Sequence, residues 1–184
     1  MQKQIIISVM SQDRPGIIAD ITGAIYELNG DLADLNQSVL FGYLTMILVA
    51  TFDGHITSEE ILARIARIQS PTKLDVIVKE MDTPLETSHS GLPEKTYIVT
   101  AQGENKSGLV HGISSFCYHH DINILDLATT RTDNRYTMIL QLDLSRVNSI
   151  IEVRKKLQEY GKQSGLHVVM QHHQLFKVTN EINF

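Results

Sequence analysis

The 184-residue chain has only one cysteine, Cys117, and therefore cannot form an internal disulfide. Such low cysteine usage fits a reducing compartment, and we interpret Cys117 as a core residue. No apolar run approaches the roughly 20 residues that are needed to cross a bilayer. The N-terminus also lacks the basic flank, long apolar region and cleavage site of a signal peptide. These absences predict a soluble, cytoplasmic protein that does not contact a membrane.

Positive charge is scarce as well. The chain has 16 lysines and arginines against 21 aspartates and glutamates, and its formal net charge is −5. No cluster of basic residues could neutralise several phosphates at once. We therefore expect no direct binding of nucleic acid.

The sequence also lacks the motifs that carry catalysis or hold cofactors. There is no nucleophile elbow, P-loop or Gly-rich dinucleotide motif, which predicts a protein without enzymatic activity or a cofactor. The pairs His119-His120 and His172-His173 suggest a metal site, but adjacent residues of a helix or strand point in different directions. We therefore expect no metal site.

An internal repeat indicates the domain organisation. The tetrapeptide Thr45–Leu48 recurs intact as Thr137–Leu140, at an offset of 92 residues. Gly16 matches Gly108 at the same offset, and no gap is needed along the whole repeat. Such a constant register predicts two copies of one fold. The expected organisation is a first domain at 1–81, a linker with two prolines at 82–94, a second domain at 95–178 and a C-terminal tail at 179–184.

Both copies show the same order of sequence periodicities. Alternating apolar runs predict strands, and apolar residues spaced three and four apart predict two helices in each copy. The order is strand, helix, strand, strand, helix, strand, which is the ferredoxin-like α+β arrangement: an antiparallel four-stranded sheet with both helices on one face. The expected strands are 4–10, 32–40, 43–52 and 74–81 in the first copy and 96–102, 124–131, 136–144 and 166–172 in the second.

The segment Asp13-Arg14-Pro15-Gly16-Ile17, between the first predicted strand and helix, resembles the loop of ACT domains. Two such units in a chain of this length are similar to the family that includes the glycine cleavage system transcriptional repressor. The resemblance implies two tandem ACT domains, a small amino acid such as glycine as ligand, and control through a protein partner. Because the chain has no DNA-reading element, the implied partner is a DNA-binding transcription factor.

Two interpretations of this loop remain open. In the structural one, Pro15 occupies the first turn of the following helix and Asp13 caps its free amides. In the functional one, the N-terminus of that helix binds the carboxylate of an amino acid, and Gly16 lets the ligand approach the backbone.

The resemblance also implies where a ligand makes contact. In amino-acid-binding relatives, contacts come from the position three before the loop glycine and from a polar residue about fifteen after it, which are Asp13 and Asp31 here and Asn105 and Asn123 in the second domain. An asparagine amide can both donate and accept, so the second domain is expected to suit a zwitterion better. The predicted ligand-binding residues are Asp13, Arg14, Pro15, Gly16, Ile17, Asp31, Asn105, Lys106, Gly108, Leu109 and Asn123.

Two functions from different classes follow. The first is an amino-acid-responsive transcriptional regulator of the glycine cleavage type, which acts through a protein partner. The alternative is a ligand-independent interaction module that regulates a metabolic enzyme. Exposed sheet edges make a homodimer compatible with both functions.

Overall fold

The computed structural model describes residues 2–82 and 91–180, with the side chains of 177–180 excepted. The chain divides into two compact units, Met1–His89 and Ser90–Phe184, which we call unit 1 and unit 2. Most of the predicted linker, residues 83–90, and the last four residues of the predicted tail lie outside the described residues.

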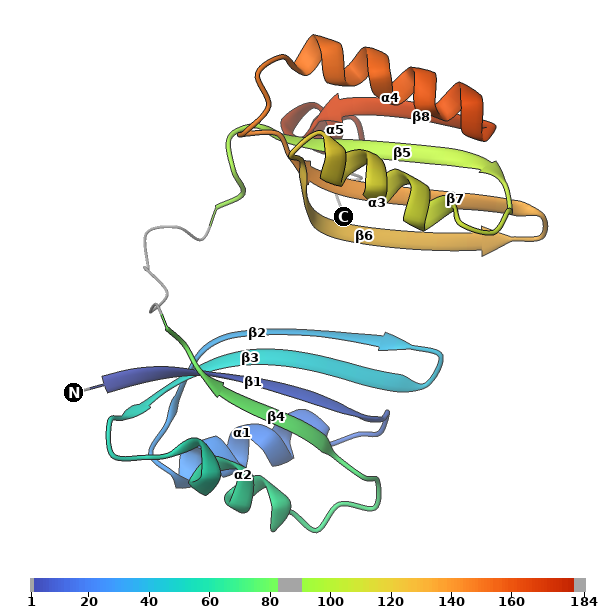
Figure 1. The fold of residues 1–184 in the computed structure, drawn as a ribbon. Helices are drawn as coiled ribbons and strands as arrows, with labels where there is room; N and C mark the ends of the chain where they lie inside the picture. The colour runs from blue at the N-terminus through green and yellow to red at the C-terminus, as the bar shows by residue number, and fades with distance from the viewer. Residues whose placement is uncertain (1, 83–90, 181–184) are drawn as a thin grey trace. The chain divides into compact units, whose positions relative to one another are not determined.

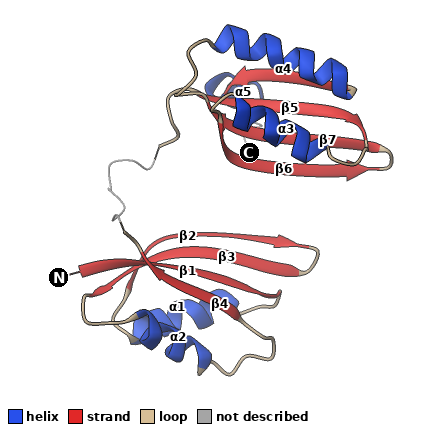
Figure 2. Cartoon of the chain, in the orientation of Figure 1, coloured by secondary structure: helices blue, strands red, loops and turns tan. Residues whose placement is uncertain are grey.

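Unit 1 is an antiparallel sheet of four strands with two helices on one of its faces (Figures 1 and 2). The strand order is β2-β3-β1-β4, so the first and third strands lie in the centre and the other two form the edges. Its elements are β1 (Gln2–Gln12), α1 (Ile17–Glu27), β2 (Asp31–Leu40), β3 (Tyr43–Asp53), α2 (Ser58–Ala66) and β4 (Asp75–Glu80).

Unit 2 repeats this architecture, with strand order β6-β7-β5-β8. Its elements are β5 (Thr96–Glu104), α3 (Leu109–His119), β6 (Asn123–Thr132), β7 (Arg135–Asp143), α4 (Ile150–Ser164), β8 (Leu166–His172) and α5 (His173–Asn180). The predicted ferredoxin-like α+β fold is therefore confirmed in both halves of the chain. The short helix α5, which contacts β5 and β8, was not predicted.

The cores form as the sequence periodicities require. In β1, every second residue (Ile5, Ile7 and Val9) is fully buried, because successive strand residues point to opposite faces. Ile7 pairs with Leu48 of β3, and the helices add Ile21 and other residues from their apolar stripes. Unit 2 builds an equivalent core around Val99, Ala101, Ile113, Met138 and Leu140.

A β-bulge explains one recurring pair of acidic residues. The register of β2 against β3 shifts between Leu32 and Asp34, and the register of β6 against β7 shifts at the equivalent place before Asp126. In each bulge the aspartate Oδ1 accepts a hydrogen bond from the next backbone N–H, at 2.8 Å for Asp34 and 2.9 Å for Asp126. The recurrence of these aspartates therefore has a structural explanation, since each one hydrogen-bonds the main chain at a β-bulge.

Candidate functional site

The loop between β1 and α1 ends on a glycine in the left-handed region. Gly16 has φ +95° and is the N-cap of α1, and its carbonyl accepts from the Asp20 N–H at 2.9 Å. Gly108 has φ +85°, caps α3, and accepts from the Gly112 N–H at 2.8 Å. Because side chains with a Cβ rarely adopt this conformation, the fold alone accounts for a glycine at both positions.

The expected side-chain cap does not form. Helix α1 starts at Ile17, one residue after the left-handed glycine, so Pro15 precedes the helix instead of occupying its first turn. The N-cap is Gly16 rather than Asp13, and neither α1 nor α3 has a side-chain cap hydrogen bond. The other two repeat helices are capped, α2 by Thr57 within a capping box and α4 by Ser149. The first-turn amides of α1 and α3 are therefore left for water or a ligand.

Each loop is tied to the tip of the neighbouring hairpin. The N–H of Asp13 donates to the carbonyl of Gly42 at 2.8 Å, and the N–H of Asn105 donates to the carbonyl of Asn134 at 2.8 Å. The Asp13 side chain is exposed and the Asn105 side chain is half-buried. The backbone of both loops is thus held in the same way, whereas their side chains differ.

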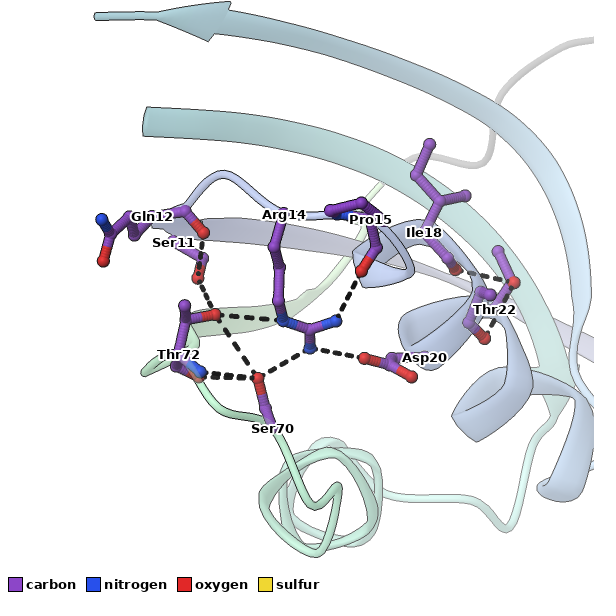
Figure 3. Close-up of polar contacts among 10 residues, drawn as sticks. Ser11, Gln12, Arg14, Pro15, Ile18, Asp20, Thr22, Ser70 and Thr72 are labelled. Atoms are coloured by element: carbon purple, nitrogen blue, oxygen red, sulfur yellow. Dashed lines mark hydrogen bonds and ion pairs between the residues drawn. The ribbon is translucent and has the colours of Figure 1, made fainter. Parts of the chain in front are cut away.

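Arg14 is the centre of a polar network that unit 1 alone contains among the described residues (Figure 3). Its Nη2 contacts Asp20 Oδ2 at 2.5 Å and donates to Ser70 Oγ at 2.7 Å. Its Nε donates to Thr72 Oγ1 at 3.2 Å, and its Nη1 donates to the carbonyl of Pro15 at 3.0 Å. The guanidinium, which has five N–H donors, is therefore largely satisfied within the protein. It joins the loop to the segment between α2 and β4.

Lys106, which replaces Arg14 in unit 2, has a different environment. Its Nζ lies 3.6 Å from Glu104 Oε2, and both side chains are more than half exposed. The position of Asp20 is taken by Gly112, which carries no carboxylate. The loop of unit 2 therefore lacks the equivalent clamp.

A cavity of about 470 Å³ lies over the loop and the start of α1. It brings together five of the predicted residues, Asp13 to Ile17, with the two following helix residues. The hairpin adds Gln37 of β2 and Leu44 of β3, which the sequence reasoning did not identify because they belong to no motif. Ile17 itself is 1% exposed, as is expected of a core residue, so it can offer a ligand only its backbone.

Asp31 is not part of this cavity. It follows α1, whereas Asp13 precedes it, and an 11-residue helix is about 16 Å long. Asp31 instead lines a separate cavity of about 430 Å³ with residues of α1 such as Thr22 and Tyr26. One small amino acid cannot touch both aspartates within unit 1.

Asn123 and Asn105 are separated in the same way by α3. Asn123 lines a polar cavity of about 350 Å³ together with Tyr118, Asp121, Ile122, Asp143 and Arg146. Arg146, which sequence reasoning missed, has its Nη1 3.6 Å from Asp121 Oδ1 and is largely exposed. At the other end, Gly108 caps α3 and Leu109 is 8% exposed within the core.

The paired histidines bond to main-chain oxygens. Nδ1 of His119 lies 2.6 Å from the carbonyl of Ser115, and Nδ1 of His120 lies 2.8 Å from that of Phe116. Nε2 of His172 lies 3.1 Å from the carbonyl of Glu94, and Nδ1 of His173 lies 3.3 Å from that of Thr96.

Among the described residues, no helix is long and apolar enough to cross a membrane.

Comparison with known proteins assigns the family. A model of the ACT domain matches residues 3–79 and again residues 95–171, so the chain belongs to the ACT domain family. The chain is 33% identical over 86 residues to a UPF0237 protein of Methanocaldococcus jannaschii and 36% identical to one of Clostridium acetobutylicum. These matches cover 46% of this chain and 96% and 97% of the relatives, so each relative matches about one unit.

Two solved structures match nearly the whole chain in fold. A protein of unknown function from Galdieria sulphuraria has a TM-score of 0.71 at 15% identity, covering 94% of this chain and 99% of its own. A proposed glycine cleavage system transcriptional repressor has a TM-score of 0.67 at 12% identity, covering 93% of this chain and 97% of its own. At these identities the likeness establishes the tandem fold alone.

Proposed function

We propose that the protein is an amino-acid-responsive regulator that binds a small amino acid at the loop of unit 1 and acts through a protein partner. The observation that carries this proposal is the uncapped N-terminus of α1, which opens into the cavity lined by Asp13, Gly16 and Gln37. Backbone amides and the positive end of the helix dipole favour a carboxylate there.

The rest of the cavity suits the other parts of an amino acid. The Asp13 carboxylate and the Gln37 amide oxygen are acceptors for an ammonium group. Ile18 and Leu44 offer an apolar wall for a short side chain. Because the loop is clamped through Arg14, little ordering is needed when the ligand binds, and preorganisation of this kind favours affinity. These features favour unit 1, although the asparagines of unit 2 favoured that unit at the sequence level.

Regulation requires that the ligand bind two states of the protein, or of its complex, with different affinity. The fold that the chain shares with a proposed glycine cleavage system transcriptional repressor supports glycine as the first ligand to test and a DNA-binding transcription factor as the partner. The partner carries the DNA-reading function, and this chain supplies the ligand response.

Thermal unfolding in the presence of each of the twenty amino acids tests this proposal. A ligand that binds only the folded state stabilises it by RT ln(1 + [L]/Kd), about 2.7 kcal/mol at a hundredfold excess over Kd. We expect one or two small amino acids to raise the melting temperature of the wild type, and Asp13→Ala to abolish the shift. Asn105→Ala, the matched change in unit 2, is expected to keep it.

The result that contradicts the proposal is an unchanged melting temperature with every amino acid at millimolar concentration. A shift that Asn105→Ala removes and Asp13→Ala leaves intact would move the site to unit 2.

The alternative function, a ligand-independent interaction module that regulates a metabolic enzyme, is favoured by a different observation. Unit 1 exposes large apolar side chains at the tip of its β2–β3 hairpin, including Leu40 and Phe41. Patches of this kind mark protein contacts. The two functions are separated by adding amino acids to a binding measurement with the isolated partner: a change in affinity supports the sensor, and an unchanged affinity supports the module.

A further inference from the structure

The tip of the β2–β3 hairpin in unit 1 carries an exposed apolar projection. Phe41 is 94% exposed, and its neighbours Val39, Leu40 and Tyr43 are each at least half exposed. Phe41 also has φ +50°, a left-handed conformation that bulky side chains rarely adopt. Turns of this kind favour Asn, Asp or Gly, so local chain geometry does not explain a phenylalanine at this position.

Unit 2 shows that the hairpin does not need these apolar residues. The closing pair Leu40 and Tyr43 of unit 1 corresponds to the pair Thr132 and Arg135 of unit 2 in the same register. Phe41 is replaced by Asp133, which has φ +53° and therefore keeps the same turn geometry. The projection is thus a property that unit 1 has in addition to the shared fold.

Unit 1 also has an apolar groove, between α2 and the edge strand β4. This groove has a volume of about 350 Å³, and every residue that lines it is apolar: Leu62, Ala63, Ile65, Ala66, Leu74 and Val76. At the repeat offset, Arg154 and Lys155 of α4 replace Leu62 and Ala63, and Gln158 replaces Ala66. Unit 2 therefore has charged or polar residues at three of the six groove positions, whereas Leu157, Leu166 and Val168 keep the other three apolar.

The tip of the β2–β3 hairpin and the start of β4 lie at the same end of the sheet (Figure 1), since Tyr43 pairs with Gln12 and Asp75 pairs with Met10 of β1. The carbonyl of Gly42, at the hairpin tip, accepts from the N–H of Asp13, and the hydroxyl of Ser11 contacts that of Thr72 at 3.0 Å. Thr72 stands two residues before Leu74, which lines the groove. Residues 11–13, at the end of β1 and the start of the following loop, thus contact both the hairpin tip and the segment that leads to the groove.

We propose that this end of unit 1 is a self-association surface, in which Phe41 of one copy of the chain enters the α2–β4 groove of a second copy. The arrangement is reciprocal, because a two-fold axis brings the projection of each copy to the groove of the other. A second copy is the occupant that fits best, since the projection and the groove match in polarity, occur together in unit 1, and each have charged or polar residues at several of the equivalent positions of unit 2.

The size of the surface sets the strength of the dimer. Each buried phenylalanine contributes about 150–250 Å², so the two together contribute about 300–500 Å², well below the roughly 1,200 Å² at which stable interfaces begin. The dimer is therefore weak, with a dissociation constant on the order of micromolar or higher.

Sedimentation velocity of the full chain, from about 1 to about 200 µM, measures this association in the range expected of a weak interface. We expect the wild type to dimerise as the concentration rises, and Phe41→Asp and Leu62→Arg, which introduce the residues of unit 2, each to stay monomeric. Circular dichroism checks that both variants are folded. Asp133→Asn, at the hairpin tip of unit 2, is the matched control and is expected to dimerise as the wild type does.

Mixing the two variants gives the decisive measurement. Phe41→Asp chains keep the groove and Leu62→Arg chains keep the projection, so a mixed pair retains one of the two contacts and the pure variants retain none. Because the mixed pair keeps one contact instead of two, we expect the mixture to associate more weakly than the wild type but more strongly than either variant alone. A wild type that stays monomeric over the whole range would overturn the proposal. So would a dimer that both substitutions leave intact, which would indicate pairing through a sheet edge.

Discussion

The guanidinium of Arg14 is held by the carboxylate of Asp20, with Nη2 and Oδ2 2.5 Å apart, the Arg14 side chain largely buried and the Asp20 side chain partly buried. Through Ser70 and Thr72 the same guanidinium reaches the segment between α2 and β4, more than 50 residues along the chain. The loop that lines the candidate site is therefore positioned by tertiary contacts. In unit 2 the residues at these two places are Lys106 and Gly112, which cannot form such a pair.

Removing the carboxylate of this pair tests how much it stabilises unit 1. Asp20→Ala leaves a largely buried guanidinium without its charged partner, and we expect the free energy of unfolding to fall by about 1–3 kcal/mol. Glu104→Ala removes the exposed pair with Lys106, and a loss below about 1 kcal/mol is expected. Because the chain has no tryptophan, urea unfolding is followed by circular dichroism. Equal losses in the two variants would contradict the structural role of Arg14.

The helix caps give a second prediction, which tests whether Asp13 stabilises α1 in the way that Thr57 stabilises α2 and Ser149 stabilises α4. Thr57→Ala and Ser149→Ala each remove a side-chain acceptor from a helix N-terminus, and each is expected to cost about 1 kcal/mol. Asp13→Ala is expected to change the free energy of unfolding by less than about 0.5 kcal/mol, because an exposed side chain without a capping role contributes little. The same urea titrations measure all three. If Asp13→Ala costs as much as Thr57→Ala, Asp13 stabilises the helix after all.

The fold was predictable because its signals are local and repeated. The alternation of Ile5, Ile7 and Val9 indicates a half-buried strand, and the helical spacing of Ile17, Ile21 and Ile25 indicates a buried stripe. The constant offset of the repeat then transferred each assignment from one unit to the other. Helix α5 was missed because it has only eight residues and follows directly on β8, without a turn residue to mark its start.

The candidate site was predictable only in part, because its decisive features depend on distant contacts or on a single dihedral angle. Local preferences suggested that Pro15 lies in the first turn of the helix and that Asp13 caps it. In the structure the left-handed Gly16 is the N-cap, and the helix starts at Ile17. The role of Arg14 depends on Ser70 and Thr72, and the cavity includes Gln37 and Leu44 from the hairpin. No local motif relates these residues to the loop.

The two loop glycines give a third prediction, in which one unit is the control for the other. A Cβ at Gly108 meets no atom within 4 Å, and one at Gly16 meets only the end of the Arg14 side chain at 3.3 Å. Gly16→Ala and Gly108→Ala are therefore both expected to cost about 1–2 kcal/mol, mainly from the left-handed backbone. If the ligand binds at unit 1, only Gly16→Ala reduces the ligand-induced rise in melting temperature. Loss of the rise in Gly108→Ala alone would assign the ligand to unit 2.

Cys117 gives a prediction about pH. Burial raises the pKa of this thiol from 9.0 to about 11, because the thiolate is poorly solvated in the core between α3 and the sheet. The thiol stays protonated in the folded state while the unfolded chain ionises, so the stabilisation is fully present below about pH 9 and is lost as the pH rises toward 11.

With about 1.4 kcal/mol for each pH unit, the loss between pH 9 and pH 11 is on the order of 2–3 kcal/mol. Cys117→Ala is less stable at neutral pH because it leaves a small cavity, but its free energy of unfolding is expected to fall less over this range. All other ionisable groups are the same in both proteins, so the difference between the two urea-unfolding profiles isolates the thiol. Profiles that run parallel from pH 8 to pH 11 would show that the thiol ionises as readily in the folded chain as in the unfolded one.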